Sequence, residues 1–553
     1  MSSMLRIVNG RVYDPINGID GAVRDICVQD GKIVADVPAE AKRIDAQGMV
    51  IMPGGVDIHC HIAGPKVNLA RKVQPDDHRH DVHPRTAHTR SGTGGSVPST
   101  FATGYRYATL GYTTAMEAAV PPMGARHTIE ELHDTPVIDK GFYTLMGNNL
   151  LLYQLLDEGR MDQFRDVVAW LLNASKAYTV KLVNPGSDLL WKGRRNANIT
   201  DMDETIDGFD LTPRTVIKAL IDAAVDLGLP HPAHIHCNNL GHSGNVETTL
   251  DTMRTAEGQR AHITHIQFHS YGGKPGRNPV SAATRISDYV NDNPNISADV
   301  GQVMFGRSTI MTADAPLAYL LRHYSRDQRW VNADTECESG CGIIPFTYQE
   351  HVYTHALQWG IGLELFLLAK DPWRMVLSTD HPNGGSFMSY PRLIRLLMDR
   401  DFRNEQIGQV NKKAIRKTVL LDDLDREYSL QEIAIVTRAG PARLLGLANK
   451  GHLGVGADAD ITIYDEQDDK ELMFSAPRYV IKDGVAIIED HEFRTDHYGR
   501  LLHVAPDYDP EIENTIRPFF DSYYSVQFDN YAVDEVYLKA HETIPTTNGK
   551  DKT

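Results

Sequence analysis

Short apolar runs that alternate with helical stretches are the feature that most constrains how this chain folds. Runs such as AYTVKLV, PAHIHC, HITHIQF and RMVLSTD recur through the middle of the sequence, and stretches such as TPRTVIKALIDAAVDLG separate them. Repeated strand–helix units predict parallel strands covered by helices. A (β/α)8 TIM-like barrel with long loops fits this α/β pattern. A doubly wound open sheet is the alternative, but the sequence has no GxxxxGKS/T nucleotide loop to support it.

Both ends of the chain have a different texture, with short strands and tight turns. Asn9-Gly10, Asp30-Gly31 and Asp483-Gly484 each lie between apolar runs, which is typical of hairpins. A lone hairpin cannot bury a core, so we expect the two ends to pack together. With 553 residues the chain is also too long for one ordinary core. We predict a composite β-sandwich domain from residues 1–55 and 450–500, a barrel over residues 56–449 and an extension over residues 501–553.

The composition excludes several classes of function. The formal net charge of −17 argues against a nucleic-acid surface, which would normally carry a basic patch. No apolar run approaches the roughly 18 residues that a membrane span needs, and the first residues do not resemble a signal peptide. The five cysteines are scattered, which fits a reducing cytoplasm. We therefore expect a cytoplasmic protein without a nucleic-acid partner or a membrane span.

The stretch GGVDIHCHI places two histidines at the end of an apolar run. Successive side chains of a strand face opposite ways, so we expect Asp57, His59 and His61 to share the inward face. Two imidazoles at one strand end can bind one metal together. The alternative is a pair of structural, hydrogen-bonded histidines, and this motif alone does not separate the two interpretations.

Other predicted strand ends also carry polar groups that can bind metals. In HITHIQFHS, strand alternation predicts one face for His265, Gln267 and His269 and the opposite face for His262. The remaining groups at strand ends are Lys181, His234, His236 and Asp380. If the strands run parallel, these groups converge at the C-terminal mouth of the barrel, where such folds place catalysis.

Imidazole and carboxylate ligands suit zinc, and two metals about 3.5–4 Å apart need a bridging anion. A lysine that has reacted with CO2 becomes a carbamate, which is a bidentate oxygen ligand. We predict that Lys181 bridges two divalent metals, expected to be zinc, in this form. The predicted ligands are His59 and His61 on the first metal and His236 and His265 on the second. Asp380 is predicted to bind the first metal and to act as the base that takes a proton from the attacking water.

This HxH…K…H…H…D order, together with the split β-domain, resembles the amidohydrolase superfamily. Longer strings, including MPGGVDIHCHIAGPKVNLARK, LPHPAHIHCNNLGHSGNVETTL, STDHPNGGSFMSYPRLI and KGHLGVGADADITIYD, are similar to the A-type subunits of formylmethanofuran dehydrogenases. The resemblance covers nearly the whole chain and implies the amidohydrolase fold and the same six metal-site residues. It also implies hydrolysis of N-formylmethanofuran, or of a methanofuran analogue, to formate and methanofuran, or the reverse condensation.

In such families the subunit works within a larger complex, so the resemblance implies partner subunits. They are either the redox subunits of a formylmethanofuran dehydrogenase or the transferase subunits of a formyltransferase/hydrolase complex, and the bacterial-type hydrolase complex is our preference. Two alternatives remain open. A cyclic-amide hydrolase of the dihydroorotase or hydantoinase type would share every metal ligand, and a non-catalytic assembly subunit would share the fold.

Residues that contact the substrate are predicted from their place after the strands. The KVNLARK segment follows the first strand and supplies three candidates. Further candidates lie after later strands, and a basic loop is a candidate for binding an anionic carrier tail, against the alternative of solvated charge. The predicted substrate contacts are Asn68, Arg71, Lys72, Asn184, Gln267 and His381, and the basic loop residues are Lys192, Arg194 and Arg195. The histidine-rich loop with His78, His80, His83 and His88 is expected to be solvated rather than metal-binding.

Overall fold

Eight neighbouring parallel strands form the centre of the computed structural model, which describes residues 4–193, 198–274, 277–324, 331–334, 340–420 and 424–547. Among these residues the strands follow one another in chain order. They are β6 (Gly55–Cys60), β9 (Tyr112–Val120), β10 (Asp139–Leu145), β11 (Thr179–Val183), β12 (His234–His236), β13 (Ala261–Ile263), β16 (Ile296–Asp299) and β20 (Met375–Val376). A parallel bridge between Cys60 and His381 links the two ends of this row. The predicted TIM-like barrel is therefore confirmed.

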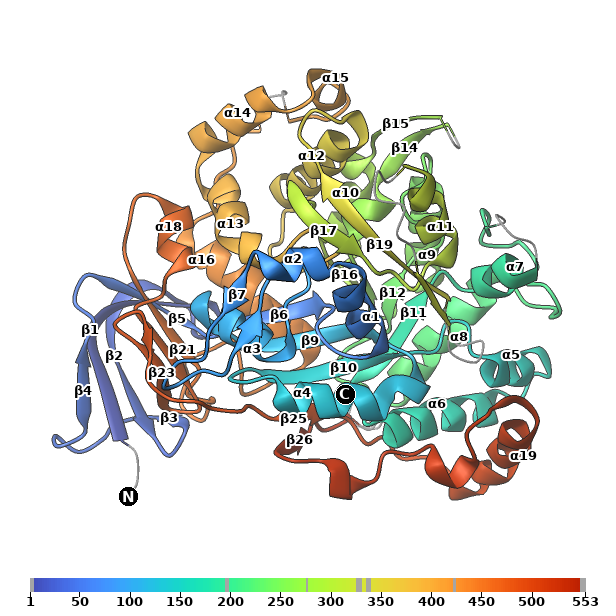
Figure 1. Cartoon of the computed structure of the whole chain (residues 1–553), viewed down its shortest axis with the longest axis horizontal. Helices are drawn as coiled ribbons and strands as arrows, with labels where there is room; N and C mark the ends of the chain where they lie inside the picture. Colours follow the sequence, from blue (N-terminus) through green and yellow to red (C-terminus); the bar gives the residue numbers. More distant parts are fainter. Residues whose placement is uncertain are drawn as a thin grey trace.

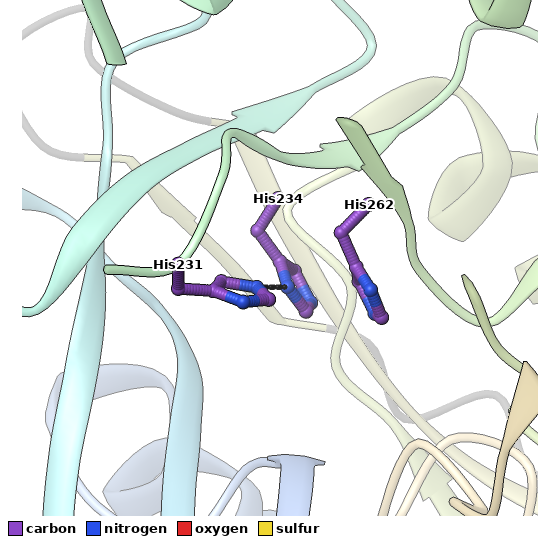
Figure 2. Close-up of side chains that lie close together, drawn as sticks. All are labelled: His231, His234 and His262. Carbon is purple, nitrogen blue, oxygen red and sulfur yellow. Dashed lines mark hydrogen bonds between the residues drawn. The ribbon is translucent and has the colours of Figure 1, made fainter. Parts of the chain in front are cut away.

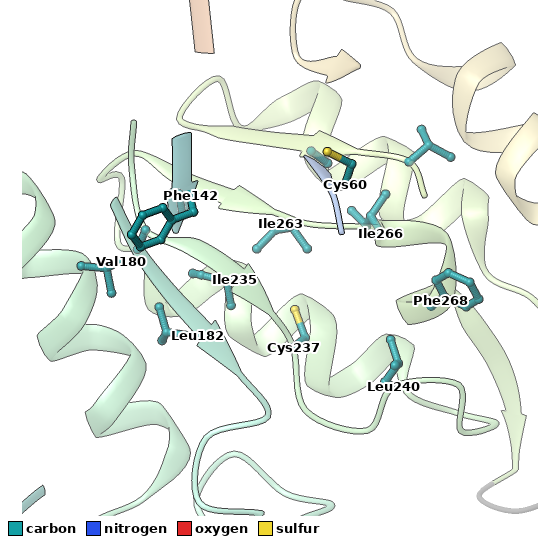
Figure 3. Close-up of a cluster of buried hydrophobic side chains, with 14 of the residues drawn as sticks. Cys60, Phe142, Val180, Leu182, Ile235, Cys237, Leu240, Ile263, Ile266 and Phe268 are labelled. Atoms are coloured by element: carbon teal, nitrogen blue, oxygen red, sulfur yellow. The ribbon is translucent and has the colours of Figure 1, made fainter. Parts of the chain in front are cut away.

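Helices between the strands cover the outside of the barrel (Figure 1). They include α3 (Thr100–Thr109), α4 (Ala125–Asp134), α6 (Met161–Ser175), α8 (Pro213–Asp226), α9 (Val246–Thr255), α10 (Ala283–Asp292), α12 (Tyr353–Leu368) and α13 (Tyr390–Met398). Figure 3 shows the apolar layer that the strands contribute, with Val180 and Leu182 of β11 beside Ile235 of β12. Cys60 and Cys237 lie in the same layer. Since strand side chains alternate, Lys181 and His236 point toward the barrel interior.

The first and last parts of the chain share one sheet, seen on the left of Figure 1. Strand β5 pairs antiparallel with β21, so the N-terminal and C-terminal segments meet through backbone hydrogen bonds. The strands of this sheet are β1 (Met4–Asp14), β2 (Ile19–Gln29), β3 (Lys32–Val34), β4 (Lys42–Asp45), β5 (Met49–Pro53), β21 (Ile461–Asp465), β22 (Tyr479–Lys482), β23 (Val485–Glu489) and β24 (Glu492–Phe493). The predicted composite β-domain is therefore present.

Two of the three predicted hairpin turns are confirmed and one is wrong. Asp30-Gly31 joins β2 to β3, and Asp483-Gly484 joins β22 to β23, with positive φ angles at all four residues. Asn9-Gly10 instead lies inside β1, where the register against β2 shifts. Asn9 has a positive φ of 65° at this irregularity, which is the backbone conformation that a tight turn would also use.

A buried cluster of charges lies beneath the barrel, where it meets the β-domain. The Lys450 Nζ lies 2.5 Å from Asp139, 3.0 Å from Asp458 and 2.9 Å from Asp460. The Lys482 Nζ lies 3.1 Å from the same Asp139 carboxylate. The three carboxylates are close enough to hold a cation, but the two ammonium groups and the Arg500 guanidinium already pair with them. This face of a barrel usually contributes to stability rather than to catalysis.

The C-terminal segment packs on the barrel. Strand β25 (Leu501–His503) adds to the starting end of β10, and β26 (His541–Thr543) pairs with β25. Helix α19 (Glu513–Tyr523) brings Phe520 against Trp170 of α6, and Trp170 also stacks on Phe528. None of the described helices combines the length and apolar character that a membrane crossing requires.

Candidate metal centre

The ends of the first and last barrel strands, which meet at the bridge between Cys60 and His381, bring His59, His61 and Asp380 together. The Nε2 atoms of His59 and His61 lie 3.0 and 3.2 Å from the same oxygen, Oδ1 of Asp380. All three side chains are buried. Burial alone would raise the pKa of Asp380, but His265 and His59 outweigh it and hold the pKa well below its ordinary value. The carboxylate is therefore ionised and faces two imidazole nitrogens.

A second group of histidines adjoins the first. The ring centroids of His236 and His265 lie 4.7 Å apart, and one nitrogen from each, together with one from His269, lies within 4.8 Å of the others. His265 belongs to both groups, because it also lies within 4.8 Å of His59 and Asp380. The two groups therefore share one continuous site. His269 was not among the predicted ligands, although its expected place on one face with His265 was a signal.

Lys181 lies in β11, and its side chain is 1% exposed. Its Nζ has no hydrogen-bond partner among the described residues. Burial is the main cause that lowers the pKa of Lys181 to about 7, and nearby carboxylates oppose it. At neutral pH a large fraction of the molecules then carries Lys181 as a neutral amine, which is the form that reacts with CO2.

The donors present fit divalent metals. His265 Nδ1 and both ring nitrogens of His269 are buried without a hydrogen-bond partner among the described residues, as is the Lys181 amine. Buried polar atoms without partners are costly, so a cluster of them indicates a bound group that completes their coordination. Imidazole, carboxylate and a modified amine form a donor set typical of zinc and its neighbours.

The prediction that Asp57 lies on the inward face of the first strand is wrong. Its carboxylate accepts hydrogen bonds from Tyr107 of α3 at 2.8 Å and Tyr390 of α13 at 2.6 Å, on the helix side of the strand. The register of β6 against β9 shifts between Asp57 and Cys60, and this irregularity reverses the alternation before His59. Burial raises the pKa of Asp57 to about 7.

The predicted faces around His265 are also wrong. Strand β13 ends at Ile263, and His265 has a left-handed backbone with φ 35° before the short helix Ile266–His269. His262 does not face outward. It faces the interior, where its Nε2 lies 3.1 Å from Asp299. The left-handed residue, rather than strand alternation, brings His265 into the site.

Carboxylates that were not predicted from the sequence orient the predicted ligands. Glu117 of β9 lies 3.0 Å from Nδ1 of His61, and Asp314 lies 3.3 Å from Nε2 of His236. Asp299 of β16 accepts a hydrogen bond from the backbone N–H of His265 at 3.1 Å. A lone carboxylate inside an apolar strand, as in TTAMEAA and ISADVG, was the available signal for Glu117 and Asp299. Asp314 lies in a loop and had no such signal.

The KVNLARK segment forms helix α1 (Pro65–Val73), and its three predicted substrate contacts do not face the metal centre. Asn68 and Lys72 are exposed at the surface. Arg71 donates to the backbone oxygens of Pro98 and Ile62 at 2.9 and 3.0 Å, which makes it a structural clamp. The same helix instead buries Lys66, whose Nζ has no hydrogen-bond partner among the described residues. Burial is the main cause of the low pKa of Lys181, and the Lys66 ammonium adds to it.

The other predicted substrate contacts are buried. Asn184 donates to Asp314 at 3.0 Å, and both amide atoms of Gln267 lack a partner among the described residues. His381 accepts from the backbone N–H of Phe387 at 3.3 Å, and its Nε2 is without a partner there. Gln267 and His381 thus have polar atoms available, whereas Asn184 is engaged.

A cavity of about 780 Å³ reaches the centre, with Asp380 in its wall. Its other walls combine apolar and polar side chains, among them Leu240, His242, Phe268, Leu317, Phe346 and Asn383. Arg194 and Arg195 of the basic loop lie outside the described residues, as does the side chain of Lys192. The candidate metal-binding groups among the described residues do not include the histidine-rich loop.

Comparison with known proteins agrees with this geometry. A family model described as "Amidohydrolase family" matches residues 42–488. The chain is 44% identical over 560 residues to Protein FwdA of Methanocaldococcus jannaschii, covering 97% of this chain and 98% of that one. It is also 39% identical over 541 residues to FhcA of the formyltransferase/hydrolase complex of Methylorubrum extorquens, covering 96% of this chain and 97% of that one. The chain belongs to the FwdA and FhcA family of amidohydrolases.

A solved structure supports the same assignment for this amidohydrolase. The crystal structure of the formyltransferase/hydrolase complex FhcABCD from Methylorubrum extorquens, in complex with methylofuran, contains a chain that is 37% identical. The match covers 98% of this amidohydrolase and all of that chain, with a TM-score of 0.92. The amidohydrolase is therefore a hydrolase whose buried histidine and aspartate groups suit divalent metals.

Proposed function

We propose that this amidohydrolase cleaves the C–N bond of an N-formylated methanofuran, or of a methanofuran analogue, to release formate and the free amine. The observation that carries the proposal is the near-complete structural match to a chain of a complex solved with methylofuran. The geometry supports it, because His59, His236, His265 and Asp380 lie in two adjoining buried groups that could hold metals, and His61 contacts Asp380. The reaction is reversible, and the direction depends on the partner subunits.

The proposed centre holds two divalent metals, with zinc as the expected ion. His59 and His61 would hold the first, His236 and His265 the second, and Lys181 would bridge them as its carbamate. His269 lies near enough to contribute to the second metal. When bound, such metals polarise a carbonyl and make water more acidic.

The chain's own groups perform the proton transfers and the binding. Asp380 would take the proton from the attacking water and pass it to the leaving amine, because an amine leaves poorly without one. The Nζ of Lys66, buried without a hydrogen-bond partner among the described residues, is a candidate to bind the formate product. Gln267 and His381 have polar atoms available for the formamide group. The cavity, with its mixed apolar and polar walls, would receive the furan end of the carrier.

We also propose that this protein works with other subunits, as FhcA does in its complex. Formate release by the transferase-linked type and formate use by the redox-linked type need different partners. Co-purification from the native source, followed by identification of the bound subunits and a test for molybdenum or tungsten, would distinguish the transferase-linked type from the redox-linked type.

The first test is formate release from N-formylmethanofuran by metal-loaded protein, beside a formylated furfurylamine that lacks the carrier tail. Formate from the full substrate supports the proposal, and the difference between the substrates measures the contribution of the tail. Hydantoin and dihydroorotate serve as the alternative substrates. Turnover of either of these, without turnover of the formamides by protein or complex, would overturn the proposal in favour of a cyclic-amide hydrolase. Absence of bound metal would instead support the non-catalytic assembly role.

A further inference from the structure

Beneath the metal centre, the barrel interior holds a row of histidines that are not ligands. Figure 2 shows His231, His234 and His262 close together, with a hydrogen bond between the first two. His231 Nε2 lies 2.9 Å from His234 Nδ1, and His234 Nε2 lies 2.8 Å from Nδ1 of the proposed ligand His59. At the far end, His231 Nδ1 lies 2.7 Å from the backbone oxygen of Leu444. These imidazoles thus join the metal centre to α17 (Gly440–Leu445) by three hydrogen bonds.

The carbonyl at the end of this row determines where each proton lies. A carbonyl oxygen only accepts, so His231 Nδ1 carries a proton and donates it to Leu444. A neutral imidazole has one N–H, which leaves His231 Nε2 to accept from His234 Nδ1. His234 Nε2 must then accept from His59 Nδ1. The consequence is that His59 Nε2, which faces Asp380, has no proton and offers its lone pair.

Burial keeps His231 neutral, because it is the main cause that lowers the pKa of this histidine well below the ordinary value. His234 is also fully buried, and each of its ring nitrogens faces another imidazole. One further acceptor favours the same tautomer of His59, because an oxygen of Asp299 lies 3.7 Å from its Nδ1. The hydroxyl of Thr264 also contacts this Nδ1, and since a hydroxyl can donate or accept, it is compatible with a proton there.

The same contacts argue against a separate metal site among His231, His234 and His262, although one nitrogen of each lies within 4.8 Å of the others. His231 and His234 direct those nitrogens at each other. His262 directs Nε2 to Asp299 at 3.1 Å and Nδ1 to Ser297 at 3.0 Å. The rings of His234 and His262 stack with centroids 4.7 Å apart, so they present faces and not lone pairs to each other.

We propose that the Leu444 carbonyl, His231 and His234 form a tautomer lock that holds His59 with its proton on Nδ1 and its Nε2 lone pair aimed at the metal. His231 and His234 are positioning residues in this proposal. It rests on the proposed role of His59 as a metal ligand and is independent of the identity of the substrate. Hydrogen-bond partners that fix the tautomer of a ligating histidine typically affect metal affinity by about 10- to 100-fold.

The first experiment measures Zn²⁺ affinity by competition with a chelator, with metal content determined on the same samples. His231→Phe removes the acceptor for His234 and frees the row to reverse, so we expect affinity at the His59 metal to fall by about 10- to 100-fold. His231→Gln keeps an acceptor oxygen near the position of Nε2 and should restore most of the loss. His503→Phe is the matched control, because His503 is a buried histidine on β25 away from the centre. The Zn²⁺ affinity of this variant should equal that of the wild type.

The second experiment does not depend on a variant that folds. Neutron diffraction from deuterated, zinc-loaded wild-type crystals locates the ring deuterons. We expect deuterons on Nδ1 of His231, His234 and His59 and none on their Nε2 atoms. A deuteron on His234 Nε2, or folded His231→Phe with wild-type Zn²⁺ affinity, would overturn the lock. Failure of formate release with this deuteron pattern intact would count against the proposed function alone.

Discussion

Glu117 offers the sharpest test of how the site selects the form of its ligands. Its Oε1 lies 3.0 Å from His61 Nδ1, and its Oε2 accepts from the backbone N–H groups of Ile62 and Ala63 at 2.5 and 2.9 Å. The side chain is fully buried. An ionised carboxylate can accept all three hydrogen bonds, whereas the amide of Glu117→Gln has only one accepting atom.

The amide of Glu117→Gln has two orientations. One is expected to lower metal affinity, and the other is expected to lower the stability of the fold. With its oxygen toward Ile62 and Ala63, its NH2 faces His61 Nδ1, which must then accept and leave the ring proton on Nε2. Metal affinity should fall by about 10- to 100-fold, which is about 1.4–2.8 kcal/mol. With its oxygen toward His61, two buried N–H donors face the NH2 group. That orientation costs about 1–3 kcal/mol for each unsatisfied donor. We therefore expect the orientation in which the amide oxygen faces Ile62 and Ala63.

The assay is Zn²⁺ competition with a chelator, together with urea unfolding of the metal-free protein. Glu131→Gln is the matched control, because Glu131 accepts from the backbone N–H of Gly64 at 2.7 Å and from Asn68 at 2.9 Å but contacts no ligand histidine. The control should lose stability and keep metal affinity. Wild-type affinity and wild-type stability together in Glu117→Gln would refute the reasoning.

Buried ionisable groups give three further predictions. Lys181→Ala should lose the metal pair, as measured by metal content, and short carboxylic acids should partly restore it; full metal content without them would refute the carbamate bridge. Asp380→Asn should retain metal but lose formate release by orders of magnitude, and an unchanged rate would remove Asp380 as the base. Burial lowers the pKa of Lys140 from 10.5 to about 7, so between these pH values the unfolded chain binds more protons than the folded protein, and stability rises with pH. Relative to Lys140→Met, the free energy of unfolding of the wild type should therefore rise across that window by on the order of 5 kcal/mol, and urea unfolding at several pH values that shows no rise would contradict it.

Strand periodicity located most of the centre from the sequence. Lys181, His236 and Asp380 each stand at the end of an apolar run, and parallel strands bring such ends to one mouth. The same reasoning failed where the backbone leaves strand geometry. A register shift turns Asp57 to the helix side, and a left-handed residue carries His265 inward. Neither feature follows from the order of apolar and polar residues alone, because both depend on neighbouring strands.

The predicted substrate contacts in KVNLARK stay untested, but the sequence reasoning missed the helix that carries them. Pro65 begins α1, and from that start a period of 3.6 residues puts Lys66 and Ala70 on the buried face. Asn68 and Lys72 then lie on the outer face. The sequence analysis placed KVNLARK only by its position after the first strand and assigned it no helix, although the proline was a readable helix start. Asp314 illustrates the remaining limit, since its approach to His236 joins residues that are distant in sequence.

The seam between Cys60 and His381 has a consequence for the synthesis of the protein. The proposed first metal takes ligands from both sides of this seam, His59 and His61 from the first strand and Asp380 from the turn after the eighth. A growing chain exposes the two histidines early, but it completes the site only after the whole barrel has left the ribosome. Strand β21 must follow before β5 gains its antiparallel partner. Bound metal would therefore mark finished molecules, and chains truncated before Asp380 should emerge from translation without it.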